Sequence, residues 1–516
     1  PSDASVFARL SQAYAWADQP VAALSAIEGA LALEPDVPEY LRAKATLASW
    51  AGRYHAAGDA YRRLGRSLPD DPDVALGLAR VSAWAGETDE AVDAYRRYLA
   101  VHPEAGTVWL ELARTESWRG NYAAALDVLD DYHARFGPSR EYTRERADVL
   151  ARGGHPTQAV RLSTSLLLDE PDSPRDNLTR AIALAMRQQA REALESLNSV
   201  RRSHPDLPET RAAARVVRTL LASSAEPRAS LYNDSDSLQV QRLAPRINIA
   251  LTTGTQFSAG YEREELEARA GSGLEQIGGG RQARHEHVWL GAAQRLQAVT
   301  LRGRLGYGSS AERDLTTYAV GAEIRPIDTV MVSLDRSTGF LVVSPRTLGL
   351  GLTKRRHQIR IEWQPTLRTY VDLDGSHETF SDGNERWEFR LAPRRSVART
   401  QRINLDLGIS MYRLSALLDL DNGYYDPRSY ESYSLTAFPY WKISENVGVG
   451  AVFAVGPQRD DRSPSFRLGA NAAAEATVGI YEPWVLKISG SATFNQRLES
   501  GAFKGYGGAV SLARRF

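Results

Sequence analysis

The 516-residue sequence contains no cysteine and only three methionines. The lack of cysteine excludes disulfide bonds and thiolate metal sites, although it leaves the cellular compartment open. No stretch approaches 18 consecutive apolar residues, so the sequence predicts no transmembrane helix. The mean hydropathy of −0.38 suits a soluble protein. Strands that turn an apolar residue outward only at every second position would give a similar mean.

An excess of charge and the signatures of catalysis are also missing. Residues 1–227 carry 27 Lys and Arg against 32 Asp and Glu, and the remaining residues carry 36 against 31. Neither part is basic enough to predict a nucleic-acid partner. The sequence has no G-x-S-x-G elbow, no P-loop and no H-E-x-x-H motif. We therefore expect no catalytic residues and no cofactor.

The length predicts at least two domains, because a chain of 516 residues is too long for one compact core. Pro1 is not a native start residue, so we expect a mature or truncated chain.

Residues of four types recur every 34 positions in the first part of the chain. Tryptophan, alanine, proline and glycine each keep their own place in the repeat, with Pro138 one position out of step. The four series are Trp16, Trp50, Trp84 and Trp118; Ala23, Ala57, Ala91, Ala125, Ala159 and Ala193; Pro35, Pro69, Pro103, Pro171 and Pro205; and Gly52, Gly86, Gly120 and Gly154.

Each series has a physical reason in a helix pair. We expect the tryptophan to end the first helix and to pack against the second, and the glycine to form a left-handed cap. The small alanine lets the helices approach, and the proline ends the second helix. The pattern resembles the tetratricopeptide repeat (TPR), with six repeats from about Ala4 to Leu207 and a capping helix around Pro208–Ala222. Such a solenoid implies a protein-binding scaffold, although packing alone explains every residue of the series.

Beyond a boundary at Ser223–Pro227, the period of the apolar residues changes to two. Apolar and polar residues alternate in strand-like segments, among them Ala298–Gly308, His357–Gln364, Arg402–Tyr412 and Pro483–Asn495. A soluble β-sandwich would also alternate. The segments run to about 10 residues or more, however, which is the length that crosses a bilayer at a tilt.

Aromatic residues and the chain end favour a membrane barrel over a sandwich. Six aromatic residues near strand ends predict interfacial girdles: Trp363, Trp387, Tyr440, Trp441, Tyr481 and Trp484. The last strand, Tyr506–Phe516, ends in an aromatic residue and so resembles the assembly signal of bacterial outer-membrane proteins, although Arg514 departs from its apolar phase.

The fold predicted is therefore multidomain α + β. A TPR α-solenoid (1–222) and a linker (223–227) precede a transmembrane antiparallel β-barrel (228–516) of about 16 strands. A barrel of about that size leaves a channel or a plugged lumen.

Charged residues in the inward phase of the strands are the candidates for a pore wall. They can hydrogen-bond a passing polymer, or they can form a self-neutralising ladder of cross-strand ion pairs that stabilises the barrel. The two roles are compatible, and the mixed signs do not predict a strongly charged cargo. The candidates are Arg302, Arg304, Glu323, Arg325, Arg360, Glu362, Asp372, Asp374, Glu388 and Arg390.

Three further groups have weaker functional signals. Four tyrosines, Tyr424, Tyr425, Tyr430 and Tyr433, can stack on sugar rings, or they can pack a loop or join a girdle. His285 and His287 would lie about 7 Å apart on one side of a strand, which is a poor metal site without further ligands, so we predict no metal. The charged clusters Lys354–Arg356 and Arg394–Arg395 are expected between strands, as solvated turns or as contacts to lipopolysaccharide phosphates.

A TPR solenoid joined to a barrel of this size resembles the outer-membrane exopolysaccharide export porins of the cellulose, poly-N-acetylglucosamine and Pel secretion systems. The resemblance rests on SWAGRY (Ser49–Tyr54), YNDSDS (Tyr232–Ser237) and NGYYDPRSYESY (Asn422–Tyr433), and the last is most similar to the cellulose branch. It implies a Gram-negative outer-membrane channel with a periplasmic solenoid, and no chemistry in this subunit. The partners implied are a polysaccharide, outer-membrane lipid and lipopolysaccharide, and periplasmic or inner-membrane secretion proteins.

Three other functions remain open at this stage. An outer-membrane receptor or phage-adsorption protein can share the plan, and a plugged lumen with long ordered loops would favour it. A protein-assembly scaffold could use the barrel as an anchor. A barrel enzyme, such as a lipid hydrolase, would need a paired acid and nucleophile on the outer face of the barrel.

Overall fold

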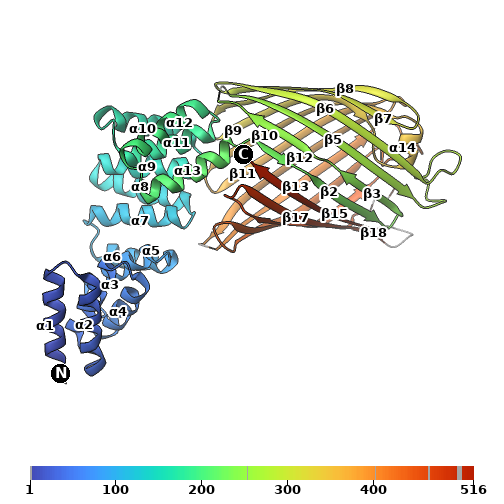
Figure 1. Cartoon of the computed structure of the whole chain (residues 1–516). Helices are drawn as coiled ribbons and strands as arrows, with labels where there is room; N and C mark the ends of the chain where they lie inside the picture. Colours follow the sequence, from blue (N-terminus) through green and yellow to red (C-terminus); the bar gives the residue numbers. More distant parts are fainter. Residues whose placement is uncertain (1–2, 253, 401, 463–464, 497–501) are drawn as a thin grey trace. The chain divides into compact units, whose positions relative to one another are not determined.

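A TPR-like helical region is followed by a closed antiparallel β-barrel in the computed structural model of the chain (Figure 1). The structure describes residues 3–252, 254–400, 402–462, 465–496 and 502–516, so Pro1 lies outside the described residues. The chain divides into two compact units, Pro1–Val149 and Leu150–Phe516.

Within the described residues, thirteen helices precede the strands and form six pairs and one final helix, as the repeat predicts. None of the described helices is both long and apolar enough to cross a membrane. The thirteen are α1 (Ala4–Trp16), α2 (Pro20–Leu33), α3 (Pro38–Trp50), α4 (Tyr54–Ser67), α5 (Pro72–Trp84), α6 (Thr88–Val101), α7 (Gly106–Trp118), α8 (Tyr122–Phe136), α9 (Arg140–Arg152), α10 (Pro156–Asp169), α11 (Pro174–Met186), α12 (Ala190–Ser203) and α13 (Pro208–Leu221).

Three of the four residue series have the structural role predicted for them. The six alanines of the series are each 0% exposed and lie where paired helices meet. Each proline of the series follows the end of a second helix by two residues. The four glycines have positive φ, and Asp18 and Gln188 take the same left-handed conformation in the first and last repeats.

The tryptophan series fulfils only half of its prediction. Trp16, Trp50, Trp84 and Trp118 each end the first helix of their repeat. The rings are not buried between the helices of their repeats, because their exposed fractions are 80, 66, 51 and 44%. The buried alanines fill the space between the helices and leave no room there for a large ring. Trp84 instead contacts Tyr54 of the preceding repeat, with 5.6 Å between ring centroids.

The barrel wall is one antiparallel sheet closed into a ring. Among the described residues, sixteen strands make up this ring, and β1 and β4 are outside it. The ring strands are β2 (Arg228–Asp234), β3 (Leu238–Leu243), β5 (Thr255–Ala268), β6 (Gln282–Leu296), β7 (Val299–Ser310), β8 (Asp314–Ile327), β9 (Val330–Phe340), β10 (Thr353–Thr366), β11 (Thr369–Phe380), β12 (Glu385–Arg399), β13 (Ile403–Ala416), β14 (Tyr430–Lys442), β15 (Val447–Asp460), β16 (Arg467–Val478), β17 (Trp484–Gln496) and β18 (Ala502–Arg515).

The two short strands continue ring strands across prolines. β1 (Ser224–Glu226) pairs with β18 in the register of β2, and β4 (Arg246–Ala250) pairs with β5 in the register of β3. Pro227 and Pro245, at the two breaks, lack the N–H that a ladder needs. Their carbonyl oxygens still accept hydrogen bonds from Leu512 (3.3 Å) and Tyr261 (3.1 Å). Three residues of the segment expected to be a linker, Ser224–Glu226, therefore form a strand that pairs with the end of a ring strand.

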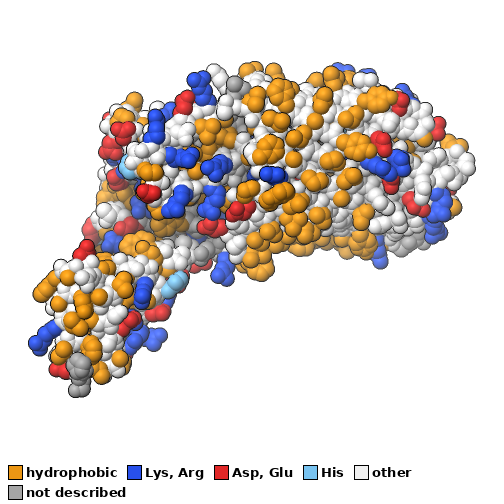
Figure 2. Space-filling view, in the orientation of Figure 1, with side chains coloured by type: hydrophobic (Ala, Val, Ile, Leu, Met, Phe, Trp, Pro, Cys, Tyr) orange, Lys and Arg blue, Asp and Glu red, His pale blue; other side chains and the backbone are white. Residues whose placement is uncertain are grey.

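Alternation along the strands gives the barrel an apolar outside and a polar inside. Leu290, Leu305 and Leu435 are 67–68% exposed, because they face outward where no protein covers them. Figure 2 shows apolar side chains spread over the barrel surface in view. The expected girdle residue Tyr440 is an exception, because its neighbour Trp441 continues the outward phase of Leu435 and Tyr440 therefore faces inward.

Candidate functional site: the barrel lumen and its loops

All ten predicted pore residues lie on β7, β8, β10, β11 and β12, in the phase opposite to the exposed apolar side chains. On β7, for example, Leu301 and Leu305 face outward while Arg302 and Arg304 face inward. The structure therefore places the predicted residues along one side of the lumen. Their contact with a passing polymer stays a prediction.

One ion pair of the lumen spans a strand because the middle strand has a glycine. Arg302 on β7 binds Asp335 on β9, with 2.7 Å between Nη2 and Oδ2. Gly321 of β8 lies between them in register. A Cβ at this position would lie 2.8 Å from the Nε atom of Arg302, which is too close for the bridge to persist. Asp335 is not among the predicted pore residues. Its alternation with the outward-facing Leu334 is the signal that could have placed it in the lumen.

Further ion pairs neutralise most of the predicted wall. Asp374 accepts from Arg360 at 2.8 Å and lies 3.7 Å from Arg390. The other contacts join neighbouring positions: Arg325 with Glu323 (2.8 Å), Arg386 with Glu388 (3.1 Å), and Arg394 with Asp372. The arrangement matches the self-neutralising ladder, and the geometry gives no strong preference for a cargo of either sign.

Arg304 has an aromatic partner in place of an acid. Its guanidinium carbon lies 4.3 Å from the ring centroid of Trp289, which faces the lumen from β6 and is 8% exposed. The ring fits over Gly260 of β5, where a Cβ would lie only 2.7 Å from the indole Nε1.

The two clusters expected between strands lie inside strands instead. Lys354 and Arg356 are in β10 and point to the lumen, where they bind the buried Glu378 at 3.1 and 3.8 Å. Arg386 binds the same carboxylate at 2.5 Å. Arg394 and Arg395 are in β12. The expectation of solvated turns was wrong. Alternation turns Lys354, Arg356 and Arg394 inward toward acidic partners, whereas Arg395 lies on the exposed outer face.

The two histidines of the RHEH segment lie in the lumen and have ordinary polar partners. His285 contacts Glu264 at 3.1 Å, and the Nε2 atom of His287 lies 2.8 Å from the hydroxyl of Thr317. In the part of the chain that the structure describes, no group of three or more possible ligands is placed to hold a metal ion.

The connections at one end of the barrel are long and pack on one another. They are 269–281, 341–352, 381–384 and 417–429, and we call them the loop cap. The second loop contains the short helix α14 (Pro345–Gly349), which a capping box on Ser344 and Thr347 fixes. Arg346 of this helix donates to the carbonyl of Asp421 at 2.7 Å and to that of Glu275 at 3.3 Å. Three loops are thereby joined by one side chain.

Asn384 is the centre of a second set of bonds in the loop cap. Its side chain is 0% exposed and donates to the carbonyl of Leu418 (2.9 Å), the hydroxyl of Tyr424 (3.0 Å) and the carboxylate of Asp426 (3.2 Å). Burial raises the pKa of Asp426, and the nearby Asp419 raises it further. The loop cap is therefore an ordered structure with a buried polar interior.

The four predicted tyrosines are dispersed. Tyr424 is buried in the loop cap, with its hydroxyl donating to Asp382 at 2.9 Å. Tyr425 is 44% exposed and donates to Asp460. Tyr430 and Tyr433 belong to β14 and lie on opposite faces of the wall. Saccharide stacking stays a prediction, which the surroundings favour most for the exposed Tyr425.

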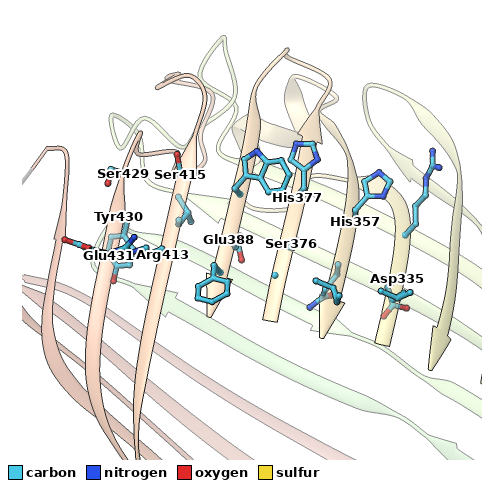
Figure 3. Close-up of a pocket in the computed structure, with 18 of the residues that line it drawn as sticks. Asp335, His357, Ser376, His377, Glu388, Arg413, Ser415, Ser429, Tyr430 and Glu431 are labelled. Carbon is cyan, nitrogen blue, oxygen red and sulfur yellow. Dashed lines mark ion pairs between the residues drawn. The ribbon is translucent and has the colours of Figure 1, made fainter. Parts of the chain in front are cut away.

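The outer side of the wall near the loop cap has an aromatic row beside a hollow of about 1240 Å³ (Figure 3). His357, His377 and Trp387 stack across β10–β12, with ring centroids 6.4 and 4.0 Å apart. Glu431 lies 3.6 Å from Arg413 in the same outward phase. An aromatic row at this height fits an interfacial girdle.

Comparisons with known proteins support the helical repeat and are weak for the barrel. The tetratricopeptide repeat family model matches residues 72–115. The comparison with curated proteins gives no match. Among solved structures, a bacterial polysaccharide outer membrane secretin is similar at 14% identity and a TM-score of 0.48, over 57% of this chain and 99% of that chain. A TPR protein from Parabacteroides merdae is similar at 16% identity and a TM-score of 0.38, over 42% and 85%. A TPR protein from Thermus thermophilus is similar at 21% identity and a TM-score of 0.30, over 35% and 99%.

Proposed function

We propose that this chain is a channel of the Gram-negative outer membrane that exports an exopolysaccharide from the periplasm to the cell surface. Residues 228–516 would form the pore, and the solenoid of residues 1–222 would lie in the periplasm and recruit other secretion components. The subunit would do no covalent chemistry, and a synthase in the inner membrane would supply the drive. Such polymers build biofilms, and cellulose is the cargo that the sequence resemblance favours.

The observation that carries the proposal is the closed sixteen-strand ring with an apolar outside and a polar, ion-paired inside. A ring of this size is too wide for its own side chains to fill. Paired charges leave hydrogen-bonding groups on the wall without a strong field of one sign, which suits a long hydroxyl-rich chain. A solenoid in the same polypeptide is of no use to a simple diffusion pore, but it suits a channel that receives its cargo from partners.

Deleting the gene and measuring secreted polysaccharide tests the proposal in the cell. We expect secretion to fall to background and to return when the full chain is supplied. A chain that lacks β18 and Phe516 is the matched control, because it keeps the solenoid but cannot close the ring. Normal secretion from the deletion strain would contradict the proposal.

The loop cap favours a second function, that of a surface receptor. Its loops are ordered by buried bonds such as those of Asn384, and ordered outer loops are what a ligand or phage would recognise. A receptor would keep its lumen closed even after the loops are shortened. Channel activity of a loop-shortened chain separates the two functions.

A further inference from the structure

The first four repeats carry a row of exposed tryptophans that the packing of the helix pairs does not require. Trp16, Trp50, Trp84 and Trp118 occupy one position in successive repeats of the unit Pro1–Val149. They are 44–80% exposed, whereas the alanines of the same repeats are fully buried. Figure 2 shows exposed apolar side chains over these N-terminal repeats. Large exposed apolar side chains that gather on one surface mark interaction sites.

Each ring of the row has a polar neighbour on the same helix face. Residues four positions apart in a helix lie one above the other, so a polar side chain lies one turn before each tryptophan. These four neighbours are Gln12, Thr46, Arg80 and Arg114. Every subsite therefore combines a flat aromatic face with a hydrogen-bonding group.

The two arginines one turn before Trp84 and Trp118 are already paired within the solenoid. Arg80 donates to both carboxylate oxygens of Glu111 in the next repeat, each at 2.9 Å. One repeat later, Arg114 donates two bonds to a single oxygen of Glu145. A face whose cations are neutralised does not select an anionic polymer or an acidic peptide. It suits an uncharged ligand that offers apolar ring faces and hydroxyl groups.

The period of the row indicates the form of the ligand. A peptide partner presents different side chains along its length and needs different pockets. Four tryptophans at the equivalent position, one for each repeat, match a ligand that is itself periodic. The row ends after the fourth repeat, because the fifth and sixth repeats have Arg152 and Met186 at the tryptophan position.

We infer that Trp16, Trp50, Trp84 and Trp118 form a stacking track that binds an uncharged linear polysaccharide along the first four repeats. The inference rests on the proposed export function and gives the solenoid a second role, that of holding the polymer itself. Each indole stacks on a sugar ring, and the polar neighbour one turn away hydrogen-bonds its hydroxyls.

Calorimetric titration of the full chain in detergent tests the track, with three hexasaccharides as probes: neutral cellohexaose, cationic chitosan and anionic oligogalacturonate. We expect cellohexaose to bind and the two charged probes to bind at least about tenfold more weakly. Because linked contacts multiply, replacing all four tryptophans with alanine is expected to weaken cellohexaose binding by about a hundredfold or more. Phenylalanine at the same four positions keeps a ring and should keep most of the affinity.

The matched control replaces two exposed apolar side chains on second helices, V21A and V101A, and should leave the affinity unchanged. Thermal unfolding of each variant shows that the solenoid remains folded. Equal cellohexaose binding by the parent and the four-alanine chain overturns the inference. So does binding of a peptide, rather than cellohexaose, to the tryptophan row.

The channel itself distinguishes failure of the track from failure of the proposed function. In the four-alanine chain, barrel conductance and its block by cellohexaose should be unchanged. If none of the substitutions weakens cellohexaose binding while cellohexaose still blocks the channel, the stacking track is wrong and the export proposal stands. Absence of both binding and block in the parent chain contradicts both proposals.

Discussion

Single buried alanines decide how closely the helices of each repeat approach. Ala91 of α6 is 0% exposed and belongs to the core cluster that also contains Ala113 and Leu129. The sequence could predict these positions, because a fixed 34-residue spacing of a small residue has a direct steric meaning. It could not predict the exposure of the tryptophans, because helix position alone does not say which face another helix covers.

We predict that A91L destabilises the solenoid by about 1–3 kcal/mol, the usual cost of forcing extra carbon atoms into a packed core. The measurement is the unfolding free energy of the solenoid transition in denaturant. A100L, on an exposed position of the same helix, is the control and should change little. Equal effects of the two substitutions would contradict the packing role of the alanine series.

Glu90 makes the solenoid sensitive to acid. Hydrogen bonds from Arg62, at 3.0 and 2.8 Å, lower the pKa of this carboxylate to about 2. A lowered carboxylate pKa contributes stability that is present above the ordinary value of 4.5 and is lost as the pH falls through about 2. We expect E90Q to flatten the loss of stability over this pH range, as followed by thermal unfolding. The control D59N removes a more exposed partner of Arg62 and should keep the dependence of stability on pH. The same pH dependence in E90Q as in the parent chain would contradict the role of Glu90.

The bridge between Arg302 and Asp335 predicts a change in ion selectivity. Removing the acid with D335A leaves an unpaired cation in the lumen, so the reversal potential in a salt gradient should shift toward anion preference. The double variant R302A/D335A removes both charges and should return the potential to near that of the parent, which the double-mutant cycle tests. Identical shifts in the single and double variants would show that the two groups do not act as a pair.

At the scale of the elements, the strands could be predicted from the sequence and the loop cap could not. The predicted segments Ala298–Gly308 and Pro483–Asn495 match β7 and β17 to within one or two residues at each end. Alternating residues on a barrel wall face either the outside or the lumen, so the pattern is easy to recognise. The cap depends on bonds between loops far apart in sequence, such as those from Asn384 to Leu418 and Asp426. Nothing periodic marks these residues, so only the folded wall shows that they meet.

The buried amide of Asn384 predicts how firmly the loop cap holds. N384A leaves the buried carboxylate of Asp426 without one of its donors, and an unsatisfied buried group costs about 1–3 kcal/mol. We expect more frequent opening in single-channel records. N422A, which removes one bond to Asp382, is the milder control. Opening that is no more frequent in N384A than in N422A would argue against the cap as the barrier.

At the scale of the whole molecule, the chain joins a helical repeat region to a closed barrel, and neither part alone indicates export. Under the proposed function, the solenoid would hold secretion partners and, along its tryptophans, the polymer. The barrel has a polar lumen with paired charges and an ordered loop cap, which would serve as the passage. The pairing of the two parts in one polypeptide is the reason to assign the polymer, rather than a small solute, to the passage.

The most direct test of this account is single-channel recording of the chain in planar bilayers, with cap loops 341–352 and 417–429 shortened. We expect a steady open conductance that cellohexaose blocks, while the parent chain opens rarely. A chain with shortened loops that assembles as a barrel and yet conducts no ions would contradict the central claim that the lumen is an export passage.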